Sequence, residues 1–185
     1  MGGGVAVILA IFVVFSSKVR AVTTTAEILV GGCRYSVTID YECSITAGVP
    51  SEFTITSFVL VSPSCSSSLS EDEIGKALGI ELSNNPPFYI PQCNWSQTPC
   101  PTFSNTWRKY EFKCWSKRQD TNNNVIYEPC LDKGGCQTEY EYCFDGTNVI
   151  SMQTNWSYEY GSGDCPFPVI PQPYYECFKV GTMCN

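Results

Sequence analysis

The chain has 185 residues, a formal net charge of −7, twelve cysteines and no histidine. An acidic chain repels phosphate backbones and anionic lipid, so neither nucleic acid nor a membrane surface is expected as a partner. The absence of histidine excludes Ser-His-Asp and Cys-His catalytic groups, histidine-containing zinc sites and histidine-ligated haem.

Residues 1–21 have the form of a secretory signal peptide. Residues 5–15 (VAVILAIFVVF) are an unbroken apolar run, and Val19-Arg20-Ala21 provides a cleavage site. We expect cleavage after Ala21. The alternative is an uncleaved anchor, although the run is shorter than the roughly 20 residues that a membrane-spanning helix needs. The cleaved chain keeps nine basic residues against eighteen acidic ones, a net charge of −9.

The strongest local pattern is a strand over residues 33–45 (CRYSVTIDYECSI), in which apolar or cysteine residues alternate with polar ones. This period of two predicts a strand with one buried and one solvated face. Turn-forming residues 48–51 and the β-branched, aromatic run 53–61 follow. These segments predict a β-hairpin.

A single short helix is expected after this hairpin. Ser70 and Glu73 have the capping-box spacing, and Ile74, Ala77 and Leu78 follow at helical spacing, with Gly79 as the predicted stop. From residue 83 to 101 the chain is rich in proline, which predicts an irregular crossing. We therefore divide the cleaved chain into residues 22–102, with the hairpin, helix and crossing, and residues 103–185.

The C-terminal segment predicts an antiparallel β meander, unless the disulfides impose another strand order. The turn-forming run 119–123 and Asp145-Gly146 each separate two β-rich segments, as expected of hairpins. The predicted strands are residues 107–116, 124–128, 136–144, 149–158 and 174–180. The expected fold is mainly β (α+β in the N-terminal half), built from small disulfide-rich antiparallel sheets and hairpins with one short helix.

All twelve cysteines lie beyond the leader, and no two have the Cys-x-x-Cys spacing of redox centres or zinc ribbons. In an exported chain, an even number of cysteines predicts a disulfide framework. Twelve cysteines allow on the order of ten thousand pairings, which the sequence leaves open. Cys33 and Cys43 are not expected to pair, because a strand separates them by about 33 Å. The cysteines are Cys33, Cys43, Cys65, Cys93, Cys100, Cys114, Cys130, Cys136, Cys143, Cys165, Cys177 and Cys184.

Three short motifs occur in order in the second half: Cys114-Trp115, Glu128-Pro129-Cys130 and residues 142–146 (YCFDG). With these motifs the chain resembles a loose group of uncharacterised, cysteine-rich secreted bacterial proteins. The resemblance implies secretion and disulfide bonding. It implies no activity, so it assigns no functional residue.

Two residue classes could carry function. Carboxylate pairs beside aromatic rings are typical of glycoside hydrolases, which makes five glutamates candidate acids, although Glu alternating with Tyr also fits a solvated strand face. These glutamates are Glu111, Glu128, Glu139, Glu141 and Glu159. Tryptophans provide contact area for protein or glycan recognition. The four tryptophans are Trp95, Trp107, Trp115 and Trp156. Asn94 and Asn155 begin N-glycosylation sequons, which matter only in a eukaryotic secretory pathway.

These observations predict a secreted or cell-surface, disulfide-stabilised module with a non-enzymatic binding or structural role. Its expected partner is an extracellular protein or glycan, with no membrane association after cleavage and no cofactor or metal. Two alternatives stay open. One is a secreted effector or inhibitor that acts through the Pro/Cys loop at residues 91–101, and the other is a carboxylate-based glycan hydrolase.

Overall fold

The computed structural model describes residues 22–44, 50–62, 64–91, 93, 99–102, 105–161, 164–167 and 174–180. The predicted leader, Asn94, Trp95, Cys184 and most of the 91–101 loop lie outside these residues, and the side chains of Asn155 and Trp156 are also outside the description. The described chain begins with β1 (Val22–Val30), directly after the predicted cleavage site.

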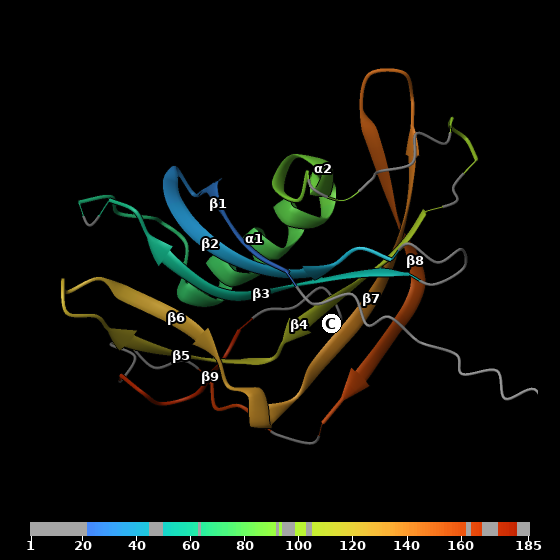
Figure 1. Cartoon of the computed structure of the whole chain (residues 1–185). Helices are drawn as coiled ribbons and strands as arrows, with labels where there is room; N and C mark the ends of the chain where they lie inside the picture. Colours follow the sequence, from blue (N-terminus) through green and yellow to red (C-terminus); the bar gives the residue numbers. More distant parts are fainter. Residues whose placement is uncertain are drawn as a thin grey trace, which may run out of the picture.

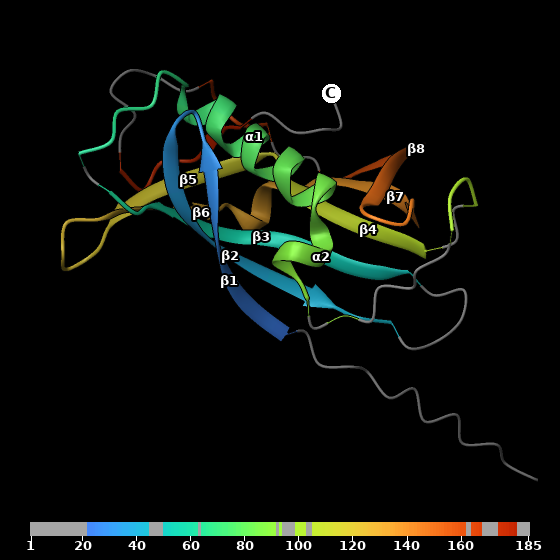
Figure 2. The same cartoon turned by 90° about the horizontal axis from the view of Figure 1, so that it is seen from above.

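The described chain is rich in strands, which confirms the mainly β, disulfide-rich fold class. The further strands are β2 (Cys33–Glu42), β3 (Ser51–Leu60), β4 (Asn105–Phe112), β5 (Cys114–Gln119), β6 (Val125–Pro129), β7 (Gly135–Phe144), β8 (Val149–Tyr160) and β9 (Phe178–Lys179). The helices are α1 (Glu71–Asn84), α2 (Pro86–Tyr89) and a 3-10 turn, η1 (Leu131–Lys133). Helix α1 packs against the sheet (Figures 1 and 2).

The N-terminal hairpin is confirmed. Burial alternates along β2, and β2 pairs antiparallel with β3 from Tyr35 opposite Leu60 to Glu42 opposite Glu52. Strand β1 was not expected from the sequence, because its first residues are polar. It pairs antiparallel with β2 over its whole length, and Ile28 and Val30 are buried. The N-terminal part of the sheet therefore has three strands instead of two.

The C-terminal strands do not follow the order of a simple meander, because the sheet branches at β3. One edge of β3 pairs with β2, whereas the other edge pairs with two strands in succession. Residues 51–54 pair parallel with β4, and Phe58 and Val59 pair antiparallel with β6. The resulting sheet is mixed and has nine strands, in the order β8-β7-β4-β3-β6-β5-β9, with β1 and β2 on the far side of β3. Strands from both sides of residue 102 thus share one sheet.

The branch explains why the strand expected over residues 107–116 is instead two strands. Up to Phe112 the chain pairs with β7, and from Cys114 it pairs with β6 and β9. Lys113 lies at the break, where its N–H donates to the Gly134 carbonyl and its own carbonyl accepts from Val180. The chain therefore moves outward by one strand position at Lys113, and β6 occupies the space beside β3. The last predicted strand, 174–180, is reduced to Phe178 and Lys179.

The hairpins on either side of this branch are confirmed. β5 and β6 pair antiparallel across the 119–123 turn. β7 and β8 pair antiparallel across the turn at Asp145 and Gly146, with a register shift between Thr138 and Tyr140.

Helix α1 begins as predicted and ends later. The Ser70 hydroxyl accepts from the Glu73 N–H at 3.3 Å, and the Glu73 carboxylate accepts from the Ser70 N–H at 2.8 Å, which completes the capping box. The predicted stop at Gly79 is wrong, because the helix continues to Asn84. A Cβ at position 79 would lie 2.8 Å from a Glu111 carboxylate oxygen. Gly79 is therefore explained by close packing against β4.

Five disulfides connect described residues, and Cys136 is disulfide-bonded as well. The pairs are Cys33–Cys65, Cys43–Cys93, Cys100–Cys143, Cys114–Cys165 and Cys130–Cys177. Cys33 and Cys43 have different partners, as their separation along β2 requires. Only Cys100–Cys143, among these five, crosses the boundary at residue 102. The chain is thus a disulfide-stabilised module. In the described part of the chain, no helix is long and apolar enough to cross a membrane.

Candidate binding surface and buried ionic cluster

The most exposed tyrosine of the described chain lies in a turn beside β5. Residues 174–177, which we call the tyrosine turn, expose 44% of Tyr174 and 73% of Tyr175. Tyr175 has a φ of 63°, in the left-handed region that a side chain makes unfavourable by roughly 1–2 kcal/mol. Its N–H donates to the Lys117 carbonyl at 2.8 Å, and Cys177, two residues further on, is linked to Cys130. The turn therefore holds an exposed ring on a strained, anchored backbone.

A chain of side chains connects this turn to the core. Lys117 Nζ lies 5.5 Å from the centre of the Tyr174 ring and donates to Glu71 Oε1 at 2.9 Å. The Tyr127 hydroxyl donates to the same oxygen at 3.0 Å, and its ring stacks on Phe58 at a centroid distance of 4.5 Å. Burial, followed by the Glu71 charge, raises the pKa of Tyr127 above its ordinary value. The neutral phenol of Tyr127, the ammonium of Lys117 and the carboxylate of Glu71 therefore hold fixed positions between the tyrosine turn and the core.

A bidentate ion pair borders the turn on the neighbouring strands. Arg118 Nε and Nη2 donate to the two oxygens of Glu128 at 2.8 and 2.7 Å, and each side chain is about 40% exposed. The hydrogen bonds from Arg118 lower the pKa of Glu128, so this carboxylate stays ionised. Two parallel N–H···O bonds fix the guanidinium plane. The surface thus combines exposed tyrosine rings with an oriented arginine.

Sequence reasoning missed the tyrosine turn, because it placed residues 174–180 in a strand, whereas the strand of the structure is limited to Phe178 and Lys179. The available signal was the Tyr174-Tyr175 pair, one residue short of Cys177, in a stretch with proline on its N-terminal side. Aromatic residues next to a disulfide cannot all enter a small core, and one exposed ring was to be expected there.

A second cluster is buried under α1. Lys109, on β4, exposes 2% of its side chain, and its ammonium has three partners: Gly79 O at 2.9 Å, Ser83 Oγ at 3.0 Å and Glu111 Oε1 at 2.9 Å. Burial lowers the pKa of Lys109, while the Glu111 charge acts in the opposite direction. All three ammonium hydrogens are thus used within the protein, which satisfies a charge that is costly to bury.

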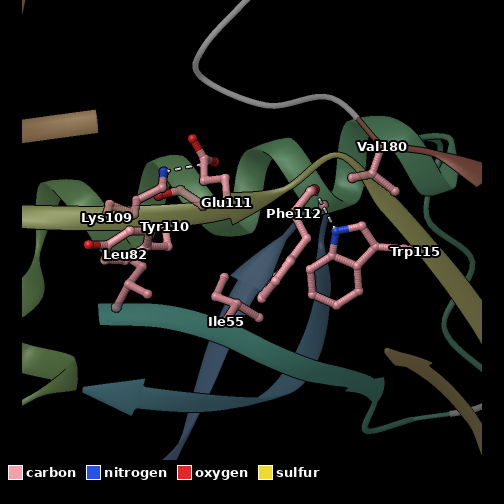
Figure 3. Close-up of a pocket in the computed structure, with 10 residues that line it drawn as sticks. Ile55, Leu82, Lys109, Tyr110, Glu111, Phe112, Trp115 and Val180 are labelled. Atoms are coloured by element: carbon pink, nitrogen blue, oxygen red, sulfur yellow. Dashed lines mark hydrogen bonds and ion pairs between the residues drawn. The ribbon is translucent and has the colours of Figure 1, made fainter. Parts of the chain in front are cut away.

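A small cavity adjoins this ion pair (Figure 3). It has a volume of about 30 Å³ and lies between α1, β4, Ile55, Trp115 and Val180. A volume of this size is enough for a water molecule and too small for an organic ligand. Gly75 and Gly79 face it from α1, and a Cβ at Gly75 would overlap Val180. The two glycines therefore let the sheet approach the helix closely.

The Ser83–Lys109 contact has the residue types of a serine–lysine nucleophile, which requires a reachable hydroxyl. Ser83 is 1% exposed, and its hydroxyl donates to the Gly79 carbonyl at 2.8 Å. Tyr142, also buried, donates to the Ser83 carbonyl at 3.1 Å. These bonds connect α1 to β4 and β7. We therefore interpret the cluster as a structural connection between the helix and the sheet.

The five candidate glutamates are spread over four strands. Four of them form ion pairs: Glu111 with Lys109, Glu128 with Arg118, Glu139 with Arg108 and Glu159 with Lys113. Glu139 and Glu141 lie side by side on one face of β7. Glycosidase carboxylates must instead face each other across a bound sugar. Among the described residues, no group of three or more Cys, Asp or Glu side chains is arranged to hold a metal ion.

Two of the candidate tryptophans are core residues. Trp107 and Trp115 are 4% and 5% exposed. Trp107 packs against Phe53, and the Trp115 ring packs against Phe58 while its N–H donates to the Phe112 carbonyl at 3.0 Å. Their rings stabilise the fold instead of forming an exposed surface. Asn155 lies in β8.

No protein family model, curated protein or solved structure matches this chain. Its functional assignment therefore rests on the geometry described above.

Proposed function

We propose that this protein is an extracellular, non-enzymatic binding module that contacts a partner protein through the tyrosine turn. The disulfide framework supports an extracellular location, since such frameworks form and persist in oxidising environments. The dispersed glutamates support a role without carboxylate catalysis.

The observation that carries the proposal is the conformation of Tyr175. A side chain that is 73% exposed makes little contribution to the core, yet its residue occupies a strained backbone region. Backbone strain of this kind persists only where contacts with the surrounding structure enforce it, and strained residues concentrate at functional sites. Here a disulfide and a backbone hydrogen bond impose it. The ring is thereby positioned before a partner arrives, which lowers the entropy cost of binding.

The chemistry of the surface favours a protein over a glycan. Tyrosine and arginine are the residue types that dominate protein-binding hot spots. Sugar recognition also needs polar groups that are available to sugar hydroxyls. Both Glu128 oxygens already accept from Arg118, and Glu71 Oε1 already accepts from Lys117 and Tyr127. The turn therefore offers two exposed aromatic rings and a single exposed carboxylate, that of Glu176.

The test compares Tyr175→Ala with Phe88→Ala, a matched control that removes another exposed ring, 77% accessible, from α2. The secreted protein is labelled and applied to an array of extracellular proteins of its source organism and to a glycan array. We expect binding to at least one protein, weakened about 30-fold or more by Tyr175→Ala and unchanged by Phe88→Ala, because a hot-spot truncation costs about 2 kcal/mol or more.

Two results would overturn the proposal. Binding to glycans alone would show that the partner is a glycan instead of a protein. Protein binding that Tyr175→Ala leaves intact would show that the contact surface lies elsewhere. A stability measurement on each variant separates lost binding from lost folding.

A further inference from the structure

Strand β1 has one unpaired edge. Its nine residues pair with β2 on one side, and on the other side no strand in the described part of the chain pairs with it (Figure 1). Backbone N–H and C=O groups along such an edge are a template for another strand. One face of β1 is exposed at Thr23, Thr25, Glu27 and Leu29, whereas on the other face Ile28 and Val30 are buried and Val22 is exposed.

Apart from the charge of Glu27, this edge lacks the features by which proteins usually prevent edge pairing. Its sequence, VTTTAEILV, contains no proline, glycine or lysine, and threonine and valine favour strands. Its register with β2 is unbroken over the nine pairs. In contrast, β8 pairs with β7 through a register shift, and such irregularities twist an edge away from a partner. Strand β1 is thus the regular, unprotected edge.

We propose that two copies of this chain associate through β1, with their outer edges paired antiparallel about a twofold axis at Thr25. An antiparallel edge contact is self-complementary, as a twofold dimer requires. In this register Thr25 faces its own copy, Thr23 faces Glu27, and Val22 faces Ile28. The apolar side chain of Val22, 46% exposed in the single chain, then gains a neighbour on the helix-facing side of the sheet.

The charges of β1 are compatible with self-association through this edge. Two acidic chains repel, so a contact between copies must keep carboxylates apart. Strand β1 carries one acid, Glu27, whose carboxylate lies 3.3 Å from Arg34 Nη1. In the proposed register each Glu27 faces a threonine instead of the other Glu27. Like charges are therefore not opposed across the twofold axis.

The test measures the mass of the secreted, disulfide-bonded protein by sedimentation equilibrium across a concentration series. We expect a reversible monomer–dimer equilibrium. Thr25→Lys places two lysines opposite each other and weakens dimerisation about fivefold or more, because directly opposed like charges are unfavourable. Thr25 is exposed, so the substitution leaves the core intact.

Two controls define the edge and the register. Ile150→Lys, on β8, changes an exposed residue of a different strand and leaves the dimer unchanged. Thr23→Lys places a lysine opposite Glu27 of the other copy and maintains or strengthens the dimer. Weakening by Thr23→Lys equal to that by Thr25→Lys would overturn the register. A chain that stays monomeric up to about 0.5 mM, where even weak pairing with a Kd near 1 mM is detectable, would overturn the dimer.

Discussion

Replacement of Lys109 by methionine tests the physical interpretation of the buried cluster. The substitution keeps the length of the side chain and removes the ammonium, which leaves the Glu111 carboxylate, 10% exposed, without its ion-pair partner at 2.9 Å. Breaking a buried pair in this way costs about 3–5 kcal/mol. For a domain of this size, about 2–4 °C of melting temperature is lost per kcal/mol, so we expect the midpoint to fall by about 6–20 °C.

The double variant Lys109→Met/Glu111→Gln separates charge from packing. It removes both charges and keeps both shapes, so we expect it to recover most of the lost free energy of unfolding.

Urea unfolding at pH 7 measures these differences. Lys133→Met is the matched control, because Lys133 forms an exposed pair with Asp132 at 3.5 Å, and such pairs contribute about 0–1 kcal/mol. A loss below about 1 kcal/mol for Lys109→Met, or a double variant no more stable than the single one, would refute the reasoning.

Three further outcomes are expected. Tyr175→Gly should be more stable to urea than Tyr175→Ala by about 1 kcal/mol, because only alanine keeps the cost of the left-handed backbone; equal stabilities would contradict the strain. Burial raises the pKa of Tyr140 to about 12, so stability should fall as the pH rises from about 10 to 12, where the unfolded chain has lost a proton that the folded chain keeps. In alkaline urea titrations, Tyr140→Phe should reduce the slope of the free energy of unfolding against pH by up to about 1.4 kcal/mol per pH unit. An unchanged slope would contradict the raised pKa of Tyr140. Replacing Cys33 and Cys65 by serine opens a 32-residue link and should lower the free energy of unfolding by about 3–4 kcal/mol, measured against the intact protein by calorimetry; an unaltered midpoint would contradict this.

The sequence predicted those elements whose signals are local. Alternation in residues 33–42 identified β2, Asp145-Gly146 identified the β7–β8 hairpin, and Ser70 with Glu73 identified the start of α1. Each of these patterns depends only on neighbours within a few residues.

The errors concern contacts between distant segments. The break at Lys113 depends on β6 entering beside β3, and the continuation of α1 through Gly79 depends on Glu111 approaching the helix. Neither contact has a local signature. The inward direction of Lys109, in contrast, did have a local signature. Lys109 lies two residues after Trp107, so the two side chains project to the same face of a strand.

The branch at β3 has a consequence for the speed of folding. β1, β2 and β3 can pair as soon as residues 22–60 are available, but the second edge of β3 must wait for β4 and β6. Thr54 and Tyr110, which are joined across that edge, are 56 positions apart in the chain. Long-range pairing of this kind slows folding, and the hydrophobic side chains of β3 stay accessible to other chains meanwhile. During synthesis, the interval before residues 105–129 arrive is therefore the period of greatest exposure to aggregation.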